Sequence, residues 1–263
     1  MKIVHTSLYS LIAVMIAFAG CSPSNGGNSE DMGSSPTFNP LSYVYQVPAV
    51  DPANFDNYPI NNPYFPLVPG TTYEYESEEE GELTLEHFYV TYDTLEIAGV
   101  ECTVVYDWEE VYVEDLDDWF LTEETYDYHA QDVDGNVWYF GEDTVAYLYD
   151  DSWNYEGTST EGSWRAGVDD ATAGIVMLAS PSPGVSYQQE YLEGEAEDMA
   201  KVLRLNARVS IDHDDFDNCL VTKEWSKLEP GKIEHKYYAP GIGLVYVEEL
   251  KGKTVKVELV DMY

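Results

Sequence analysis

Runs of β-branched and aromatic residues, broken at short intervals by Gly, Pro, Asn or Asp, dominate the chain from position 71 to its end. Val, Thr, Tyr, Phe and Trp fit the pleated surface of a strand, whereas Gly and Asp favour the turns between strands. The last run alternates cleanly, with Val255, Val257 and Leu259 on one face and Lys256 between them on the other. The pattern predicts strands over residues 71–77, 83–95, 101–114, 119–129, 136–141, 145–150, 187–192, 202–211, 218–226, 233–239, 243–250 and 253–261.

The links between these runs decide how the strands pair. Gly99, the turn at residues 134–136 and Gly252 each join two runs, and such short links suit antiparallel hairpins rather than helical crossovers. We expect an all-β, mainly antiparallel fold, a curved meander forming a barrel, half-barrel or sandwich with little helix. The one helix candidate spans residues 196–202, and residues 165–186 are expected to form a long irregular crossing, either a lid or a surface loop.

Charge is distributed unevenly along the chain. The 263 residues hold 12 Lys and Arg against 50 Asp and Glu, a net charge of −38, and no basic residue lies between Lys2 and Arg165. This charge excludes nucleic acid as a partner, and the chain as a whole would also be repelled by an anionic membrane surface. Since 44% of the residues are hydrophobic, a folded core is still expected. The acidity indicates a solvated surface, or recruitment of cations by the front half.

The N-terminus indicates export and anchoring. An apolar run at residues 11–19 is too short to span a bilayer permanently. It leads into Phe18-Ala19-Gly20-Cys21, which resembles the lipobox of bacterial lipoproteins, with Phe18 in place of the usual Leu. The alternative is an ordinary secretory signal. The resemblance implies that Cys21 is the mature N-terminus and carries acyl chains such as palmitate in the cell envelope, and Ser22 favours the outer membrane.

Residues 22–40 are rich in Ser, Gly, Asn and Pro and hold almost no large apolar side chain. Such a segment cannot bury enough surface to fold and behaves as a flexible tether. The sequence therefore divides into a signal peptide at residues 1–20, a lipidated tether at residues 21–40, and a single β-rich domain at residues 41–263.

Two cysteines remain after Cys21. Cys102 and Cys219 both lie in apolar, strand-like segments. Export permits a disulfide between them, and a pair of buried free thiols fits the sequence equally well. No His lies beside either of them, so they give no metal signature.

A candidate cation loop lies at Asp132, Asp134 and Asn136, where oxygen ligands alternate as they do in calcium loops. An EF-hand needs Gly at the sixth position and Glu at the twelfth, which here are Val137 and Asp143. The EF-hand is therefore excluded. A hairpin turn explains the segment, and a Ca²⁺ site of another kind is the alternative; no other cofactor is expected.

Several segments resemble a family of exported acidic bacterial proteins and lipoproteins that has no assigned activity. They are NPYFPLVPGTT at 62–72, AQDVDGNVWYFGED at 130–143, GSWRAGVDD at 162–170, QEYLEGEAEDMA at 189–200 and LEPGKIEHKYYAPGIGLV at 228–245. The Pro-Leu-x-Pro-Gly opening and the APGIGLVYVE closing are also similar to envelope lipoproteins built on open β-barrels. The resemblance spans about residues 60–250 and implies membership without any chemistry.

Aromatic residues are abundant, with 23 Tyr, 6 Trp and 8 Phe. They either fill the core or line a groove in which flat rings bind a sugar, a lipid or a cation. Trp138, Trp164 and Tyr237 are the first candidates for such a groove, because they lie in the segments that carry the resemblance.

Polar candidates are Glu190, Glu197 and His235. A glycosidase needs two carboxylates at a set separation, for which Glu190 and Glu197 are candidates, and His235 lies between Glu234 and Lys236. In a chain with 50 carboxylates such pairs are inevitable, and no motif for nucleophilic catalysis occurs.

The sequence favours a binding protein over an enzyme. We expect a lipid-anchored envelope protein that binds a small molecule, a glycan or an envelope protein. The alternatives are a module that binds Ca²⁺ and a hydrolase that depends on a carboxylate pair.

Overall fold

The computed structural model describes residues 43–55, 59–79, 81–251 and 253–263. The predicted signal peptide, Cys21 and the tether at residues 21–40 lie outside them, so these remain predictions. Strands make up most of the described chain, and its helical element is the short 3₁₀ turn η1 (Pro52–Asn54), capped by the Asp51 side chain. No helix in the described ranges is long and apolar enough to cross a membrane.

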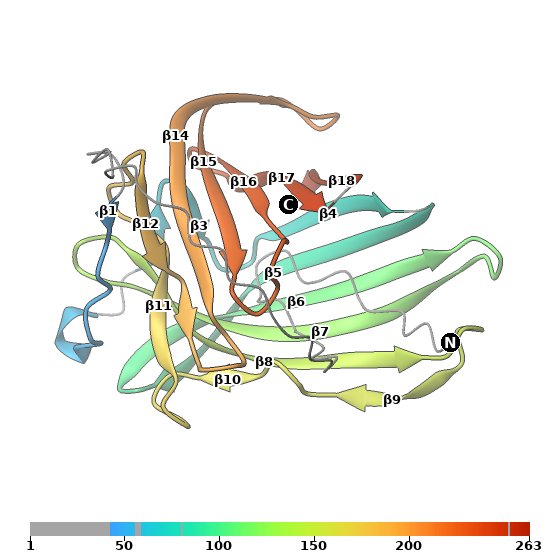
Figure 1. Ribbon diagram of the computed structural model, residues 1–263, viewed down its shortest axis with the longest axis horizontal. Helices are drawn as coiled ribbons and strands as arrows, with labels where there is room; N and C mark the ends of the chain where they lie inside the picture. Colours follow the sequence, from blue (N-terminus) through green and yellow to red (C-terminus); the bar gives the residue numbers. More distant parts are fainter. Residues whose placement is uncertain (1–42, 56–58, 80, 252) are drawn as a thin grey trace, which may run out of the picture.

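One sheet holds almost all the strands (Figure 1). Their order is β1-β12-β14-β15-β16-β17-β18-β4-β5-β6-β7-β8-β11-β13, with β9 and β10 also paired to β8. Every pairing is antiparallel except that of β1 with β12, which confirms the predicted all-β class. The first strands are β1 (Tyr43–Val44), β4 (Thr72–Glu79), β5 (Glu82–Ile97), β6 (Val100–Val113), β7 (Asp118–Gln131), β8 (Val137–Tyr149), β9 (Tyr155–Ser159) and β10 (Trp164–Arg165). The others are β11 (Thr172–Met177), β12 (Val185–Gln188), β13 (Glu190–Tyr191), β14 (Asp198–Ser210), β15 (Asp215–Ser226), β16 (Glu234–Ala239), β17 (Gly243–Lys251) and β18 (Lys253–Met262).

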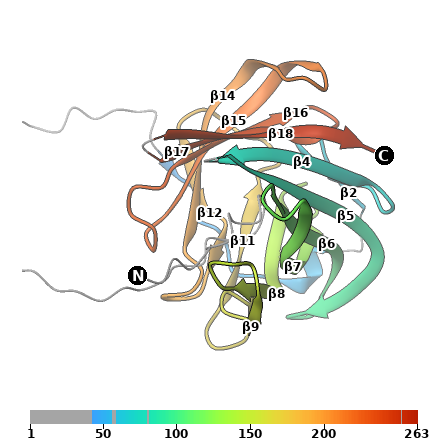
Figure 2. The same ribbon diagram turned by 90° about the vertical axis from the view of Figure 1, so that its right-hand side faces the viewer.

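The sheet curls into a nearly closed half-barrel. Strands β14–β18 run across the direction of β5–β9, and the two sets face each other (Figures 1 and 2). The ends of the sheet approach one another, since the Gln189 N–H, between β12 and β13, donates to the Asp198 carbonyl of β14 at 2.8 Å. At Gly174 of β11 an added Cβ would lie 2.3 Å from the Gln189 carbonyl carbon, so only a residue without a side chain fits there.

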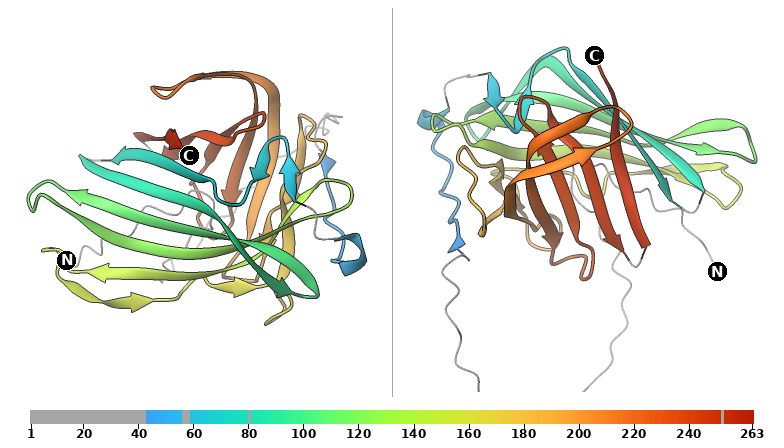
Figure 3. Two further views of the ribbon diagram at one scale, coloured as in Figure 1. Left: turned by 180° about the vertical axis from the view of Figure 1, so that it is seen from behind. Right: turned by 90° about the horizontal axis from the view of Figure 1, so that it is seen from above.

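A separate hairpin closes one end of this half-barrel. It consists of β2 (Ile60–Asn62) and β3 (Phe65–Leu67), at the start of the NPYFPLVPG segment, and it lies against the sheet (Figure 3). Phe65 contacts His129 of β7 and Tyr238 of β16, with ring centroids 5.4 and 6.5 Å apart. We call the face of the sheet that these side chains occupy the interior face, and the opposite one the outer face.

The helix expected before residue 202 is not present. The helix candidate at residues 196–202 lies in β14, where Ala200 pairs with Glu224 and Val202 with Thr222 of β15. The acidic residues before it belong to a turn, closed by the Ala196 N–H donating to the Leu192 carbonyl at 2.9 Å. Pairing with β15 thus decides the conformation, because the segment's own helical periodicity is weak.

The predicted strands at 136–141 and 145–150 form the single strand β8, which bends at Gly141. The irregular crossing at 165–186 contains β11, a buried apolar strand that pairs with β8 and β13. Gly141 adopts a φ of +130°, and its backbone packs against β10 so closely that a Cβ would lie 2.2 Å from the Trp164 carbonyl oxygen. The alternation of residues in the sequence does not predict such a bend within one strand.

Gly141→Ala tests this close approach. We expect it to lower the free energy of unfolding by about 3 kcal/mol or more, because backbone atoms of β10 must move and the positive φ is strained. Urea unfolding measures the change. Gly157→Ala in β9 is the matched control, since its φ is +151° but nothing lies within 4 Å of an added Cβ; it should cost about 1 kcal/mol. Equal losses for the two variants would contradict the interpretation.

Candidate functional site

Carboxylates line the interior face of β5–β7. Glu86, Glu109 and Glu123 are direct cross-strand neighbours, since Glu86 pairs with Glu109 and Glu109 with Glu123. Each is at most 6% exposed, although like charges opposite each other destabilise a sheet. Burial, together with the neighbouring Glu109, raises the pKa of Glu123 to about 8. Glu123 therefore keeps its proton at neutral pH.

A second acidic pair lies one step further along β7 and β8. Asp127 pairs with Glu142, and both are buried. The Tyr139 hydroxyl lies 2.5 Å from Asp127 Oδ1 and 3.1 Å from Glu142 Oε2. A phenol has one proton to donate, so one of the two carboxyls must be protonated and donate to the phenol oxygen. Burial raises the pKa of Asp127 to about 7 and that of Glu142 well above its ordinary value.

The opposite wall, on β15–β17, pairs its carboxylates with lysines. Lys236 Nζ lies 3.2 Å from Glu224 Oε2 and 3.3 Å from Glu234 Oε2. Lys232 Nζ lies 3.4 Å from Glu234 Oε1 and 3.9 Å from Glu249 Oε2. Burial acts to raise the pKa of Glu234, but the two ammonium groups more than offset it and hold that pKa below its usual value.

Glu190 of β13 has no ion pair with a lysine or arginine among the described residues. Both of its carboxylate oxygens, with Asp127 Oδ2 and the indole Nε1 of Trp164, lack a hydrogen-bond partner among the described residues. Glu190 is 1% exposed and Trp164 4%. Burial, Asp198 and Glu142 raise the pKa of Glu190 well above its ordinary value; the nearby Trp164 indole and Asp198 backbone lower it only in part. Burying such groups without partners is costly, which points to a ligand or water between them.

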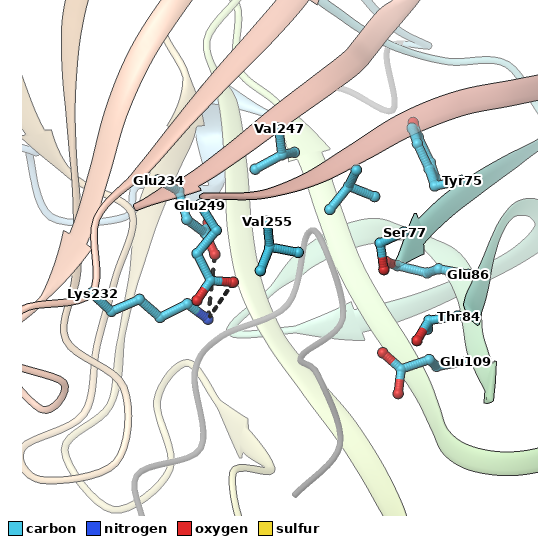
Figure 4. A pocket seen from close by; sticks show the side chains of 11 residues that line it. Tyr75, Ser77, Thr84, Glu86, Glu109, Lys232, Glu234, Val247, Glu249 and Val255 are labelled. Atoms are coloured by element: carbon cyan, nitrogen blue, oxygen red, sulfur yellow. Dashed lines mark ion pairs between the residues drawn. The ribbon is translucent and has the colours of Figure 1, made fainter. Parts of the chain in front are cut away.

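Figure 4 shows a cavity between the two walls near the mouth of the half-barrel. Its enclosed volume is small, about 30 Å³, and the surrounding space of about 460 Å³ includes open solvent. Glu86 and Glu109 face it from one side, while Lys232, Glu234 and Glu249 lie on the other. A solute entering from solvent therefore meets carboxylates on both walls.

Two of the predicted ligand-binding residues are buried inside the half-barrel, although neither lines this cavity. Glu190 and Trp164 lie together there, although the sequence offered them for separate reasons. Glu197 lies apart from Glu190's buried carboxylate, on the turn before β14, where it accepts a hydrogen bond from the Gly194 N–H at 3.1 Å and contacts Lys227.

His235 and Tyr237 lie on the outer face. They alternate with Lys236 and Tyr238 of β16, which point inward. His235 lies 3.9 Å from Glu248, and the Tyr237 ring packs against that of Tyr246.

The segment proposed as a cation loop is tightly hydrogen-bonded. Asp132 Oδ1 accepts from the backbone N–H groups of Asp134 and Asn136 at 3.0 and 2.9 Å. Asp132 Oδ2 accepts from the Asn136 amide and from the Trp138 indole, both at 2.8 Å. These donors occupy the Asp132 carboxylate and close the turn before β8. Across the described ranges, no group of three or more His, Cys, Asp or Glu is arranged to hold a metal ion.

A group of aromatic side chains stacks across the outer face of β5–β7. His87, Trp108 and Tyr106 stand face to face, with successive ring centroids 4.5 and 5.0 Å apart. The Tyr106 and Tyr147 hydroxyls both donate to Glu124. Their faces are thus covered by one another, and mainly ring edges are left for a ligand.

Cys102 and Cys219 are buried free thiols, the second of the two alternatives. Burial raises the pKa of Cys102 to about 12 and also raises that of Cys219. Both are therefore unreactive thiols that pack as small apolar side chains.

Sequence reasoning missed most of the acid-lined interior. Asp107, Asp127, Glu142 and Glu224 were lost among the 50 carboxylates of the chain. A signal was present: each occupies an alternate position of a strand whose neighbours on the same face are buried, as Glu86 does before Phe88 and Val90.

Comparisons with known proteins add little. No family model matches the chain, and no curated protein matches it. Two solved structures are similar over 76% of this chain and 98% of their own. One, from Bacteroides fragilis NCTC 9343, bears the name of an exported protein with a YmcC-like fold, at 14% identity and a TM-score of 0.37. The other, named a lipoprotein, is from Parabacteroides distasonis ATCC 8503, at 10% identity and a TM-score of 0.38. Likeness at these scores is too low to assign fold or function.

The interior carboxyls predict an unusual dependence of stability on pH. Folded Asp127 and Asp198 keep protons up to about pH 7 and Glu123 up to about pH 8, whereas unfolded carboxyls lose theirs near pH 4. Between these limits the folded state binds more protons, so stability falls as pH rises. We expect the free energy of unfolding to drop by at least about 2 kcal/mol from about pH 5 to about pH 8.

Urea unfolding of the ligand-free protein at a series of pH values measures this slope. Glu123→Gln should flatten it, because the amide has no proton to lose. Glu101→Gln, an exposed carboxyl on β6, should leave it unchanged. A stability that rises with pH over this range would show that the interior carboxyls are charged in the folded protein.

Proposed function

We propose that this protein is a lipid-anchored envelope protein that binds a small organic cation inside its half-barrel, without catalysis. The observation that carries the proposal is the buried Glu190 carboxylate, whose two oxygens have no hydrogen-bond partner, beside other carboxyls whose buried basic neighbours among the described residues are Lys232 and Lys236. An ammonium group would donate hydrogen bonds to these oxygens and supply the positive charge that allows Glu190 to lose its proton.

The charge of the chain supports a cationic ligand. A net charge of −38 raises the local concentration of cations, and a cavity lined by carboxylates focuses that field. Protonated carboxyls such as Glu123 would lose their protons as the cation enters, so binding should release protons into solution.

The sequence supports a location in the cell envelope. Cys21 lies in a lipobox-like segment and is followed by a tether, as in an anchored protein, and Ser22 favours the outer membrane. A binding protein held there would meet small cations that have crossed into the envelope.

Thermal unfolding with spermidine as the probe tests the ligand class. We expect spermidine to raise the Tm of the full chain, since a ligand at about 100 times its Kd stabilises by about 2.7 kcal/mol. Glu190→Gln should remove most of the shift, because it deletes the charge at the unpartnered carboxylate. Glu197→Gln is the matched control: it removes the same charge from a turn outside the interior and should keep the shift.

Sodium chloride at equal ionic strength and calcium chloride are run beside spermidine. An equal shift with sodium chloride would reduce the effect to screening and contradict the proposal. A shift with calcium alone would favour the divalent-cation alternative. Calorimetry in buffers of different ionisation enthalpy should show proton release in the wild type, and less of it in Glu123→Gln.

A further inference from the structure

An outer-face row of basic residues crosses β14–β16. Lys201 pairs with Lys223, and Lys223 pairs with His235, so the three side chains are direct cross-strand neighbours on one face. We call these three residues the cationic row. Like charges placed directly opposite destabilise a sheet. In a chain with 50 carboxylates and 12 basic residues, such a placement needs a reason.

Lys201 and Lys223 differ from most of the described basic residues in their ion pairing, whereas His235 lies 3.9 Å from Glu248. Arg165, Arg208 and Lys227 each lie within 4 Å of a carboxylate. Within the described ranges, Lys201, Lys223 and the exposed Arg204 have no such partner.

The environment of the cationic row is also cationic. Lys223 Nζ lies 5.2 Å from the centre of the Trp225 ring rather than against an acid. Burial lowers the pKa of His235, and Lys223 and Arg204 lower it further against the pull of Glu248. On β17, the residue that pairs with His235 is the acidic Glu248, so the row ends there.

The strand pairing also connects this row to β1, the first strand of the sheet in the sequence. Val44 of β1 pairs with Ser186 of β12, and Ser186 pairs with Lys201. The row therefore begins two strands from β1, roughly 10 Å away at the usual strand spacing. β1 lies at this edge of the sheet (Figure 1). Cys21 lies 22 residues before Tyr43 in the sequence, so a lipid on Cys21 would tether the molecule beside the cationic row.

We propose that the outer face of β14–β16, through Lys201, Arg204 and Lys223, docks on the phosphate-bearing headgroups of the membrane that holds the anchor. Two observations carry it: unpaired positive charges in register, and the chain entry beside them. The arginine fork and the two ammonium groups are donors that suit phosphate oxygens. The ring of Trp225 lies at the same face, as aromatic side chains do at membrane interfaces.

The net charge of the chain does not oppose this docking at short range. Charges further away than about 8 Å are screened at physiological salt, so headgroups near the patch sense mainly its own residues. The acidic surface elsewhere is repelled from the same headgroups. The combination selects one orientation, with β14–β16 towards the membrane.

Co-sedimentation with vesicles tests the proposal on the full chain carrying Cys21→Ser, so that no acyl chain contributes. Vesicles of phosphatidylglycerol with phosphatidylcholine are compared with vesicles of phosphatidylcholine alone, at physiological ionic strength. We expect binding to the anionic vesicles to exceed binding to the neutral ones. Lys201→Gln with Lys223→Gln should weaken the anionic binding roughly 30-fold, at about five-fold per basic residue near a charged surface.

Arg208→Gln with Lys227→Gln is the matched control. It makes the same change of net charge at two residues that are already ion-paired, so anionic binding should stay within about two-fold of the parent. Equal losses for the two double variants would overturn the proposal, because net charge alone would then explain the binding. Displacement by inorganic phosphate at millimolar concentration would overturn it in favour of a soluble phosphate ligand. Self-association that depends on Lys201 and Lys223 without vesicles would overturn it in favour of a second copy.

Discussion

Desolvation of carboxyl groups governs this structure. The interior face of the half-barrel buries Glu86, Asp107, Glu109 and Glu123 on one wall. Removing a charged carboxylate from water costs several kcal/mol, so each group must gain a proton, a cation or donors. On β15–β17 the cation is Lys236, held between Glu224 and Glu234. On β5–β8 protons take that role, which ties the stability of the fold to the pH around it.

The polar interior adjoins an apolar end of the half-barrel. Phe65 of the β2–β3 hairpin packs on His129 and Tyr238, and this end is dry enough to lower the pKa of His129 to about 3. Strands of 13 or more residues, such as β5 and β14, run from this core into the acidic region. A rigid core at one end allows unfavourable groups to be kept at the other, an arrangement typical of binding sites.

The alternation of residues along the strands allowed the fold class to be predicted from the sequence. The abundance of carboxylates prevented the same for the interior acidic site. The last predicted strand, at residues 253–261, agrees with β18 (Lys253–Met262) almost to the residue. The predicted strand at residues 202–211 covers most of β14, but its first residues were mistaken for a helix because the partner β15, not the local pattern, decides their conformation. Glu190 and Trp164 were found through sequence segments, but nothing local shows that Glu190 loses its hydrogen-bond partners on folding. That property belongs to the closed sheet, where β13 lies near β14.

One sheet separates two surfaces of opposite charge, and the separation follows from the pleat. On β15, Thr222 and Glu224 point to the interior while Lys223 between them points out. On β16, Lys236 points in beside His235, which points out. A shift of register by one residue would exchange the two faces, placing Lys223 among the interior carboxylates and Glu224 on the outside. The interior acids and the outer lysines therefore depend on the same pairing of β14, β15 and β16. Because the backbone between them is shared, a ligand that tightens this pairing from inside would also fix the spacing of the cationic row outside.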